Sequence, residues 1–173
     1  MKKIVTILVC ICLLVGVLMF STPQNEKEQY LRIHIRANSN SQVDQAVKYK
    51  VKDAVIDAMI PLIQDCRTKQ QSIETLSKNL HYIESIAQNT LNNSGVYYDV
   101  SAAIQNENFP TRSYGELTLE SGFYDALILN LGSGQGDNWW CVVYPPLCFV
   151  NGGTQVNQFK SRILEIIQHF TQN

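Results

Sequence analysis

The amino-acid sequence predicts an α+β fold, a mostly antiparallel sheet packed with two to three helices, after an N-terminal signal or transmembrane segment. Four short segments of alternating, β-branched or aromatic residues predict strands. Longer segments with apolar residues at helical spacing predict two helices between the first and second strands and one at the C-terminus. The resulting order, β-α-α-β-β-β-α, is typical of layered α+β domains.

The N-terminus has the pattern of an export signal. Lys2 and Lys3 precede an apolar run from Ile4 to Phe20, in which Thr6 is the one clearly polar residue. As a helix this run would span about 26 Å, slightly less than the ~30 Å hydrocarbon layer, and the residues after it show no clear cleavage site. A cleaved signal peptide and an uncleaved anchor both stay open. The predicted organisation is a signal peptide or membrane anchor over 1–22, a linker over 23–29 and a single extracytoplasmic α+β domain over 30–173.

The charge balance excludes some classes of partner. Of the 14 Lys and Arg residues, Lys2 and Lys3 lie in the export signal, which leaves 12 basic against 15 acidic residues in the rest of the chain. These basic residues form no block, so we expect no nucleic-acid binding and no membrane contact beyond the N-terminal segment. The positive residues before the apolar run predict that the domain is exported across the membrane.

The first strand and the first helix have the clearest local signals. Apolar and polar residues alternate over Leu31–Arg36, so we expect a half-buried strand with His34 and Arg36 on its exposed face. Ser41 and Asp44 then resemble a helix capping box. Apolar residues follow at helical spacing until Pro61, which should kink or end the helix.

The remaining elements are predicted from periodicity and turn residues. A second helix is expected over 70–92, stopped by the polar, glycine-containing residues 92–95. Strands are expected over 96–104, 124–131 and 139–144, with a loop over 109–115 and a C-terminal helix over 155–170.

The cysteines and histidines give no convincing catalytic set. Cys141 and Cys148 are close in sequence and exported, which favours a structural disulfide, with two reduced core thiols as the alternative. Their spacing is not the C-x-x-C of redox enzymes, and Cys66 is expected to be a small buried residue. No cluster of Cys and His has zinc-ligand spacing, so we expect neither a metal nor a cofactor.

A glycine-rich segment leads into both tryptophans of the chain. The glycines at 132, 134 and 136 precede a strand rather than a helix, so a turn between antiparallel strands is expected rather than a phosphate loop. Trp139 and Trp140 should face opposite sides of that strand, one toward the core and one toward solvent or a partner. The alternative is that a helix or loop covers the second ring. The predicted partner interface comprises His34, Arg36, Asn38, Ser39, Asn138, Trp139, Trp140, Tyr144, Pro145 and Pro146.

Several motifs together resemble the stage II sporulation protein R family of endospore-forming bacteria. The most specific is G-x-NWWCVVYPPLCF over 136–149. The others are LRIHIRANS over 31–39 with Asp44-Gln45, VKDAV over 51–55, FPTR-x-YG over 109–115 and G-x-Y-x-AL over 122–127. The chain departs from the family pattern slightly at Arg36 and at Ser121-Gly122.

The resemblance implies a signalling protein without catalytic activity. Such a protein is made in the forespore and exported across its membrane into the intermembrane space, either secreted or anchored. There it would activate a membrane-embedded aspartic protease, stage II sporulation protein GA, which processes the precursor of sigma factor E in the mother cell. Two alternatives from other classes are an envelope-associated hydrolase or thiol enzyme that uses Cys141 or Cys148 with His34, and a structural envelope protein.

Overall fold

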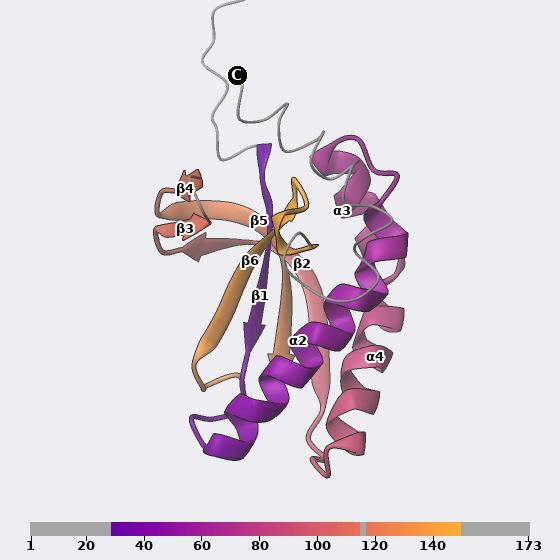
Figure 1. Cartoon of the computed structure of the whole chain (residues 1–173), viewed down its shortest axis with the longest axis vertical. Coiled ribbons are helices and arrows are strands. Elements are labelled where there is room, and N and C mark those ends of the chain that lie inside the picture. Colours follow the sequence, from indigo (N-terminus) through magenta and orange to yellow (C-terminus); the bar gives the residue numbers. More distant parts are fainter. Residues whose placement is uncertain (1–28, 115–116, 150–173) are drawn as a thin grey trace, which may run out of the picture.

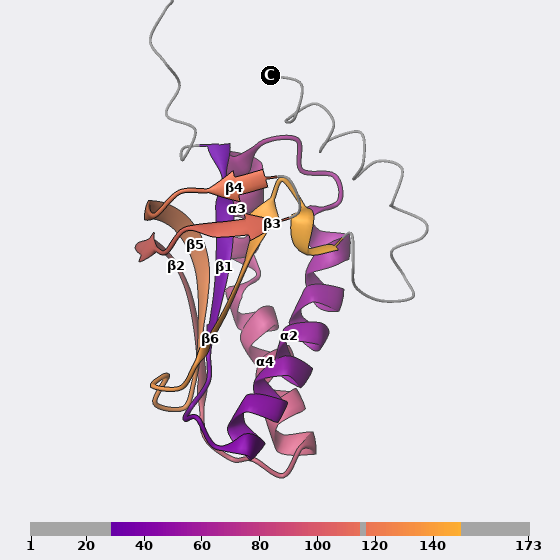
Figure 2. The same ribbon diagram turned by 60° about the vertical axis from the view of Figure 1, so that its left-hand side comes forward.

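The computed structural model describes residues 29–114 and 117–149 as a sheet with helices on one face (Figures 1 and 2). The predicted N-terminal signal and linker residues up to 28, and the predicted C-terminal helix, lie outside the described residues. Within the described part, no helix is both long enough and apolar enough to cross a membrane. The predicted α+β fold class is confirmed.

The four-stranded sheet has the order β2-β5-β1-β6, and β3 and β4 form a separate two-stranded sheet. β1 pairs parallel to β5 and antiparallel to β6, and β2 pairs antiparallel to β5, so the sheet is mixed but mostly antiparallel. The elements are β1 Leu31–Arg36, α2 Gln42–Ile63, α3 Lys69–Lys78, α4 Leu80–Asn93, β2 Val100–Phe109, β3 Arg112–Tyr114, β4 Leu117–Leu119, β5 Gly122–Leu131, β6 Asn138–Tyr144 and a 3₁₀ helix Leu147–Phe149.

β1 is a central strand, and this changes the expected exposure of its side chains. His34 and Arg36 do share one face, as predicted, but His34 is only 4% exposed and Arg36 is half-buried. The prediction of an exposed face is therefore wrong. Alternation indicates two different environments for the two sides of a strand, but it does not show that the polar side faces water.

α2 begins as predicted, because the Ser41 hydroxyl accepts a hydrogen bond of 3.1 Å from the backbone N–H of Asp44. Pro61 lies inside the helix, which continues to Ile63. The proline therefore does not end α2 where it stands. The lost backbone bond and the steric clash of a proline affect the turn before it, so the residues C-terminal to Pro61 can stay helical.

The predicted second helix is two helices, α3 and α4, separated at Asn79. The Asn79 side chain donates a hydrogen bond of 2.8 Å to the carbonyl of Thr75, and its backbone N–H bonds to Leu76 rather than to the residue four positions earlier. A side-chain amide that bonds to a helix carbonyl competes with the regular backbone bonds. The predicted stop after α4 is confirmed, and Gly95 adopts a φ of 75° there.

The segment between β2 and β5 contains a hairpin that we expected to be a loop. β2 begins later than predicted and extends to Phe109, and β3 and β4 follow it as an antiparallel pair. In Figure 1, β2 and β5 curve together toward β3 and β4. This curvature brings residues near the end of β2 within reach of side chains on β1.

Two apolar clusters cover the two faces of the sheet. The larger one joins α2, α3 and α4 to Leu31, Ile33 and Ile35 of β1. Figure 2 shows these helices together on one side. The smaller cluster lies on the other face and includes Phe109 and Tyr124, with Leu117 and Leu119 of the β3–β4 hairpin. β1 is therefore buried from both sides.

The glycine-rich residues 132–136 do not form a simple hairpin turn. β1 lies between β5 and β6, so this segment passes across the end of β1 and contacts the residues that follow it. The backbone N–H of Gly136 donates a hydrogen bond of 2.8 Å to the carbonyl of Ala37. A Cβ atom on Gly136 would lie 2.3 Å from the backbone carbonyl oxygen of Ser39, so only glycine fits.

We therefore expect Gly136→Ala to lower the free energy of unfolding by about 1–3 kcal/mol, since a backbone atom must move to admit the methyl group. Urea unfolding measures this. Gln135→Ala is the matched control in the same segment, because Gln135 is exposed, and its effect should stay within about 0.5 kcal/mol. Equal stability of Gly136→Ala and the control would contradict the close contact.

Candidate functional site

The candidate site is built on the polar side chains of β1, which we call the β1 polar row: Arg32, His34 and Arg36. All three point to the face opposite the helices, because alternate residues of a strand share a face. They meet side chains from β2, β3, β5 and β6. The site thus combines the early strand with segments 70 to 110 positions later in the sequence.

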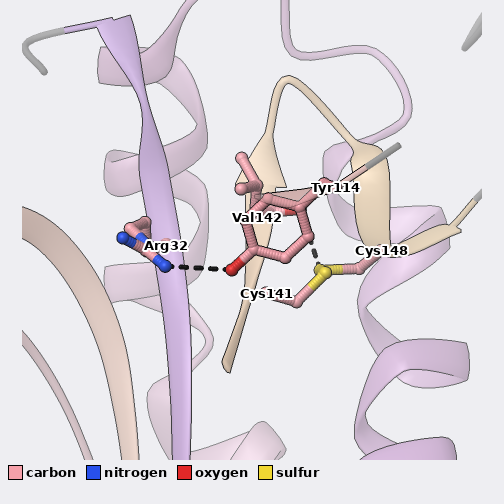
Figure 3. Close-up of a disulfide and its surroundings, with 5 residues drawn as sticks. All are labelled: Arg32, Tyr114, Cys141, Val142 and Cys148. Carbon is pink, nitrogen blue, oxygen red and sulfur yellow. Dashed lines mark hydrogen bonds between the residues drawn. A yellow bond between two sulfur atoms is a disulfide. The ribbon is translucent and has the colours of Figure 1, made fainter. Parts of the chain in front are cut away.

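Arg32 lies in an aromatic surrounding and is fully buried. The centre of its guanidinium lies 4.2 Å from the centroid of the Phe109 ring and 4.9 Å from that of Tyr124. Its Nη2 donates a hydrogen bond of 2.9 Å to the Tyr114 hydroxyl on β3 (Figure 3). Its Nε and Nη1 have no hydrogen-bond partner within residues 29–114 and 117–149. The rings offset part of the cost of burying the cation.

His34 and Arg36 share one carboxylate, that of Glu107 on β2. The His34 Nδ1 lies 3.3 Å from the carboxylate oxygens, and Arg36 forms an ion pair with the same group. Arg36 also donates a hydrogen bond of 3.1 Å to the Asn130 side chain on β5. Glu107 therefore neutralises one of the charges of the β1 polar row.

Burial keeps His34 in its neutral form. Removal from water lowers the pKa of His34 below its ordinary value, because the charged imidazolium loses more hydration than the neutral ring does. The neighbouring Asn138 and Glu107 act in the opposite direction but do not outweigh burial. The His34 ring also contacts two aromatic rings, with centroid distances of 5.8 Å to Phe109 and 5.4 Å to Trp140.

The two tryptophans face opposite sides of β6, as predicted. Trp139 packs against the helix-side cluster, and Lys52 of α2 lies 5.8 Å from its ring. Trp140 packs on the other face beside His34. The guanidinium of Arg112, from β3, lies 4.5 Å from the Trp140 ring centroid. Both indoles are half-buried, so Trp140 is partly covered by protein as well as partly open to solvent.

Asn38 and Ser39 lie beyond the end of β1 and bind the start of α2. Both donate hydrogen bonds to the buried carboxylate of Asp44, at 3.0 and 2.5 Å, and the Tyr98 hydroxyl donates another at 3.0 Å. Burial alone would raise the pKa of Asp44, but these hydrogen bonds together lower it. Asn38 also accepts a hydrogen bond of 2.9 Å from the backbone N–H of Ser133. Both residues thus have structural partners.

Tyr144, Pro145 and Pro146 lie at the far end of β6 and are buried. The Tyr144 hydroxyl donates a hydrogen bond of 2.5 Å to the carbonyl of Arg67, and burial raises the pKa of Tyr144. The disulfide between Cys141 and Cys148 closes this end, with Cα atoms 5.8 Å apart (Figure 3). Cys66 is buried as a free thiol, as expected.

The structure divides the predicted interface residues among four places. One face of the sheet holds His34, Arg36, Asn138 and Trp140, and the opposite face holds Trp139. Asn38 and Ser39 lie beyond the end of β1, and Tyr144, Pro145 and Pro146 lie at the far end of β6. The partner interface stays a prediction.

Sequence reasoning missed four residues of this site: Arg32, Glu107, Arg112 and Tyr114. Arg32 lies within the alternating first strand and shares its polar side with His34 and Arg36. Arg112 and Tyr114 belong to the FPTR-x-YG motif, which carried a usable signal. Within residues 29–114 and 117–149, no group of three or more His, Cys, Asp or Glu side chains could hold a metal ion.

The fold and site define a small α+β domain built around one buried strand with polar side chains. A family model described as Stage II sporulation protein R matches residues 27–154. The chain is also 34% identical over 165 residues to the stage II sporulation protein R of Bacillus subtilis (strain 168), an alignment that covers 87% of this chain and 73% of that protein. No solved structure matches. The chain belongs to the stage II sporulation protein R family, which gives it a role in sporulation.

Lowering the pH from 7 to 5 should reduce the free energy of unfolding through His34. Its pKa is lower in the folded protein than the ordinary 6.5, so the unfolded chain takes up a proton first. This stability is present above about pH 6.5 and declines below it, by at most about 1.4 kcal/mol per pH unit.

The variant His34→Gln should lose this part of the pH dependence of the free energy of unfolding, measured by urea unfolding at several pH values. The control His81→Gln should keep it, because the His81 side chain is fully exposed. Identical slopes for wild type and His34→Gln would contradict the assignment.

Removing the disulfide should cost about 2–3 kcal/mol, as expected for a short closed loop. Dithiothreitol should therefore lower the urea midpoint of the wild type to that of the double variant Cys141→Ser, Cys148→Ser. The same reagent should leave the double variant unchanged, because Cys66 has no disulfide to lose. A wild-type midpoint that does not respond to dithiothreitol would show that the two thiols are reduced in solution.

Proposed function

We propose that this chain is a signalling protein exported from the forespore. In the intermembrane space it activates a membrane-embedded aspartic protease, stage II sporulation protein GA, so that the precursor of sigma factor E is processed in the mother cell. The chain acts by binding and catalyses no reaction. The single observation that carries this proposal is the family match over residues 27–154, which spans all of the residues that the structure describes.

The site is chemically suited to recognition. It joins arginines to aromatic side chains, and residues of these kinds contribute most to the affinity of many protein interfaces. On the face opposite the helices, Arg112 is exposed and Trp140 is half-buried, so both have contact with solvent. The motifs that define the family also supply the interacting side chains, since Arg32, Arg112 and Trp140 come from three different motifs.

Deleting the gene in sporulating cells should stop processing of the sigma factor E precursor, and the wild-type chain should restore it. Immunoblots of the precursor measure this. Trp140→Ala should restore processing poorly, because it removes the aromatic surface under Arg112. Tyr97→Ala is the matched control, since Tyr97 is 81% exposed and outside the site, and it should restore processing fully. The amount of exported protein is measured in parallel to exclude misfolding.

Normal processing in the deletion strain would refute the signalling proposal and favour a structural envelope protein. The alternative of a thiol enzyme is tested by the variant Cys141→Ser, Cys148→Ser. That variant removes both candidate nucleophiles, so restored processing by it excludes thiol chemistry at these positions.

A further inference from the structure

The unusual feature of the site is a buried arginine without an acidic partner. Arg32 is 0% exposed, and an arginine side chain stays charged in proteins. Among the described residues, its side chain has one hydrogen-bond partner, the neutral Tyr114 hydroxyl. No carboxylate within residues 29–114 and 117–149 pairs with it, since the nearby Glu107 is bonded to His34 and Arg36. Two of its three nitrogens therefore have no acceptor in the part of the chain that the structure describes.

Such an arrangement lowers the stability of the folded protein. Burying an unpaired charge and leaving its donors without acceptors both cost free energy. Apolar side chains of similar volume often replace buried charges at no cost or with a gain in stability. Contacts with Phe109, Tyr114 and Tyr124 compensate only in part. The position therefore favours a role for Arg32 other than stabilising the fold.

The surroundings indicate the charge of the group that Arg32 binds. Three arginines, at 32, 36 and 112, lie on this face of the sheet, and Glu107 is the carboxylate among them. Of the groups around Arg32, Phe109 and Tyr124 are buried, whereas Tyr114 is half-buried. An incoming group can thus approach beside Tyr114, where Arg112 on the same strand β3 provides a second positive charge.

We propose that Arg32 and Arg112 bind a carboxylate side chain of the partner protein, which enters beside Tyr114. A carboxylate matches the geometry of a guanidinium and can accept hydrogen bonds from the nitrogens that have no partner. This inference rests on the proposed function only for the identity of the partner. The binding site itself can be tested without that partner.

The first test uses the full-length chain in mild detergent, with acetate as the probe for a carboxylate. Acetate should raise the thermal unfolding midpoint of the wild type above its value in chloride at equal ionic strength. Arg32→Met should remove this shift and have a midpoint in chloride equal to or higher than that of the wild type. Arg67→Met is the matched control at an exposed arginine, and its acetate shift should equal that of the wild type.

Three results of this test would overturn the proposal. A lower midpoint of Arg32→Met in chloride would show that Arg32 stabilises the fold. An equal acetate shift in wild type and Arg32→Met would place the binding elsewhere. A shift with inorganic phosphate but none with acetate would mean that the site takes a phosphate group. Tyr114→Phe keeps the ring and removes the hydroxyl that Arg32 bonds to, so it should retain a folded domain and a measurable acetate shift.

The second test is made in sporulating cells. Arg32→Met should be exported at the wild-type level but restore less than about a tenth of precursor processing, as expected for loss of one buried charged contact in an interface. Full restoration by Arg32→Met would overturn the proposal. If the deletion strain itself processes the precursor normally, the proposed function fails, while the acetate result still decides whether the carboxylate site exists.

The alternative occupant of the Arg32 site is a carboxylate of this chain, Glu116, which comes two positions after Tyr114 in the sequence. The variant Glu116→Gln tests this alternative. If Glu116→Gln loses precursor processing as Arg32→Met does while its acetate shift grows, Glu116 occupies the site and a partner carboxylate is overturned. Wild-type behaviour in both measurements supports the partner.

Discussion

The burial of β1 on both of its faces is the constraint on which the rest of the structure depends. Helices cover one face, and the curved ends of β2 and β5 with the β3–β4 hairpin cover the other. Because the strand alternates, every second side chain is polar and has to find its partners inside the protein. Those partners, Glu107, Tyr114 and Trp140, come from distant segments. This explains how sequence motifs that are far apart can form one site.

The three residues of the β1 polar row solve the same burial problem differently. Arg36 is paired with Glu107, and His34 is held neutral by burial. Arg32 has aromatic contacts and one neutral acceptor, so its charge is the least well compensated. At the end of the strand, the Asp44 carboxylate accepts several hydrogen bonds, and Asn38 joins it to the glycine-rich segment through the backbone N–H of Ser133. The polar groups of Asn38 and Asp44 therefore have partners, and Arg32 is the member of the β1 polar row whose charge has no acidic partner among the described residues.

Local signals predicted the fold class, β1, the start of α2, the stop after α4 and the last two strands of the sheet. They gave wrong predictions where a single side chain or a tertiary contact determines the secondary structure. Asn79 breaks a helical pattern through a single hydrogen bond to Thr75, and the β3–β4 pair has strands of three residues each, too short for a periodic signal. The sequence also could not show that β1 is central, because strand order depends on long-range pairing. For that reason His34 was expected to be exposed and Arg32 was overlooked.

The most direct measurement is solvent exchange at the Nε–H of Arg32, observed by ¹⁵N NMR and assigned by comparison with Arg32→Met. If the β1 polar row is buried as described, one arginine Nε–H signal should exchange much more slowly than those of exposed arginines such as Arg67. That signal should be absent from the Arg32→Met spectrum. Rapid exchange of every arginine Nε–H would contradict the burial of Arg32, and with it the interpretation of this face as a site held beneath β3.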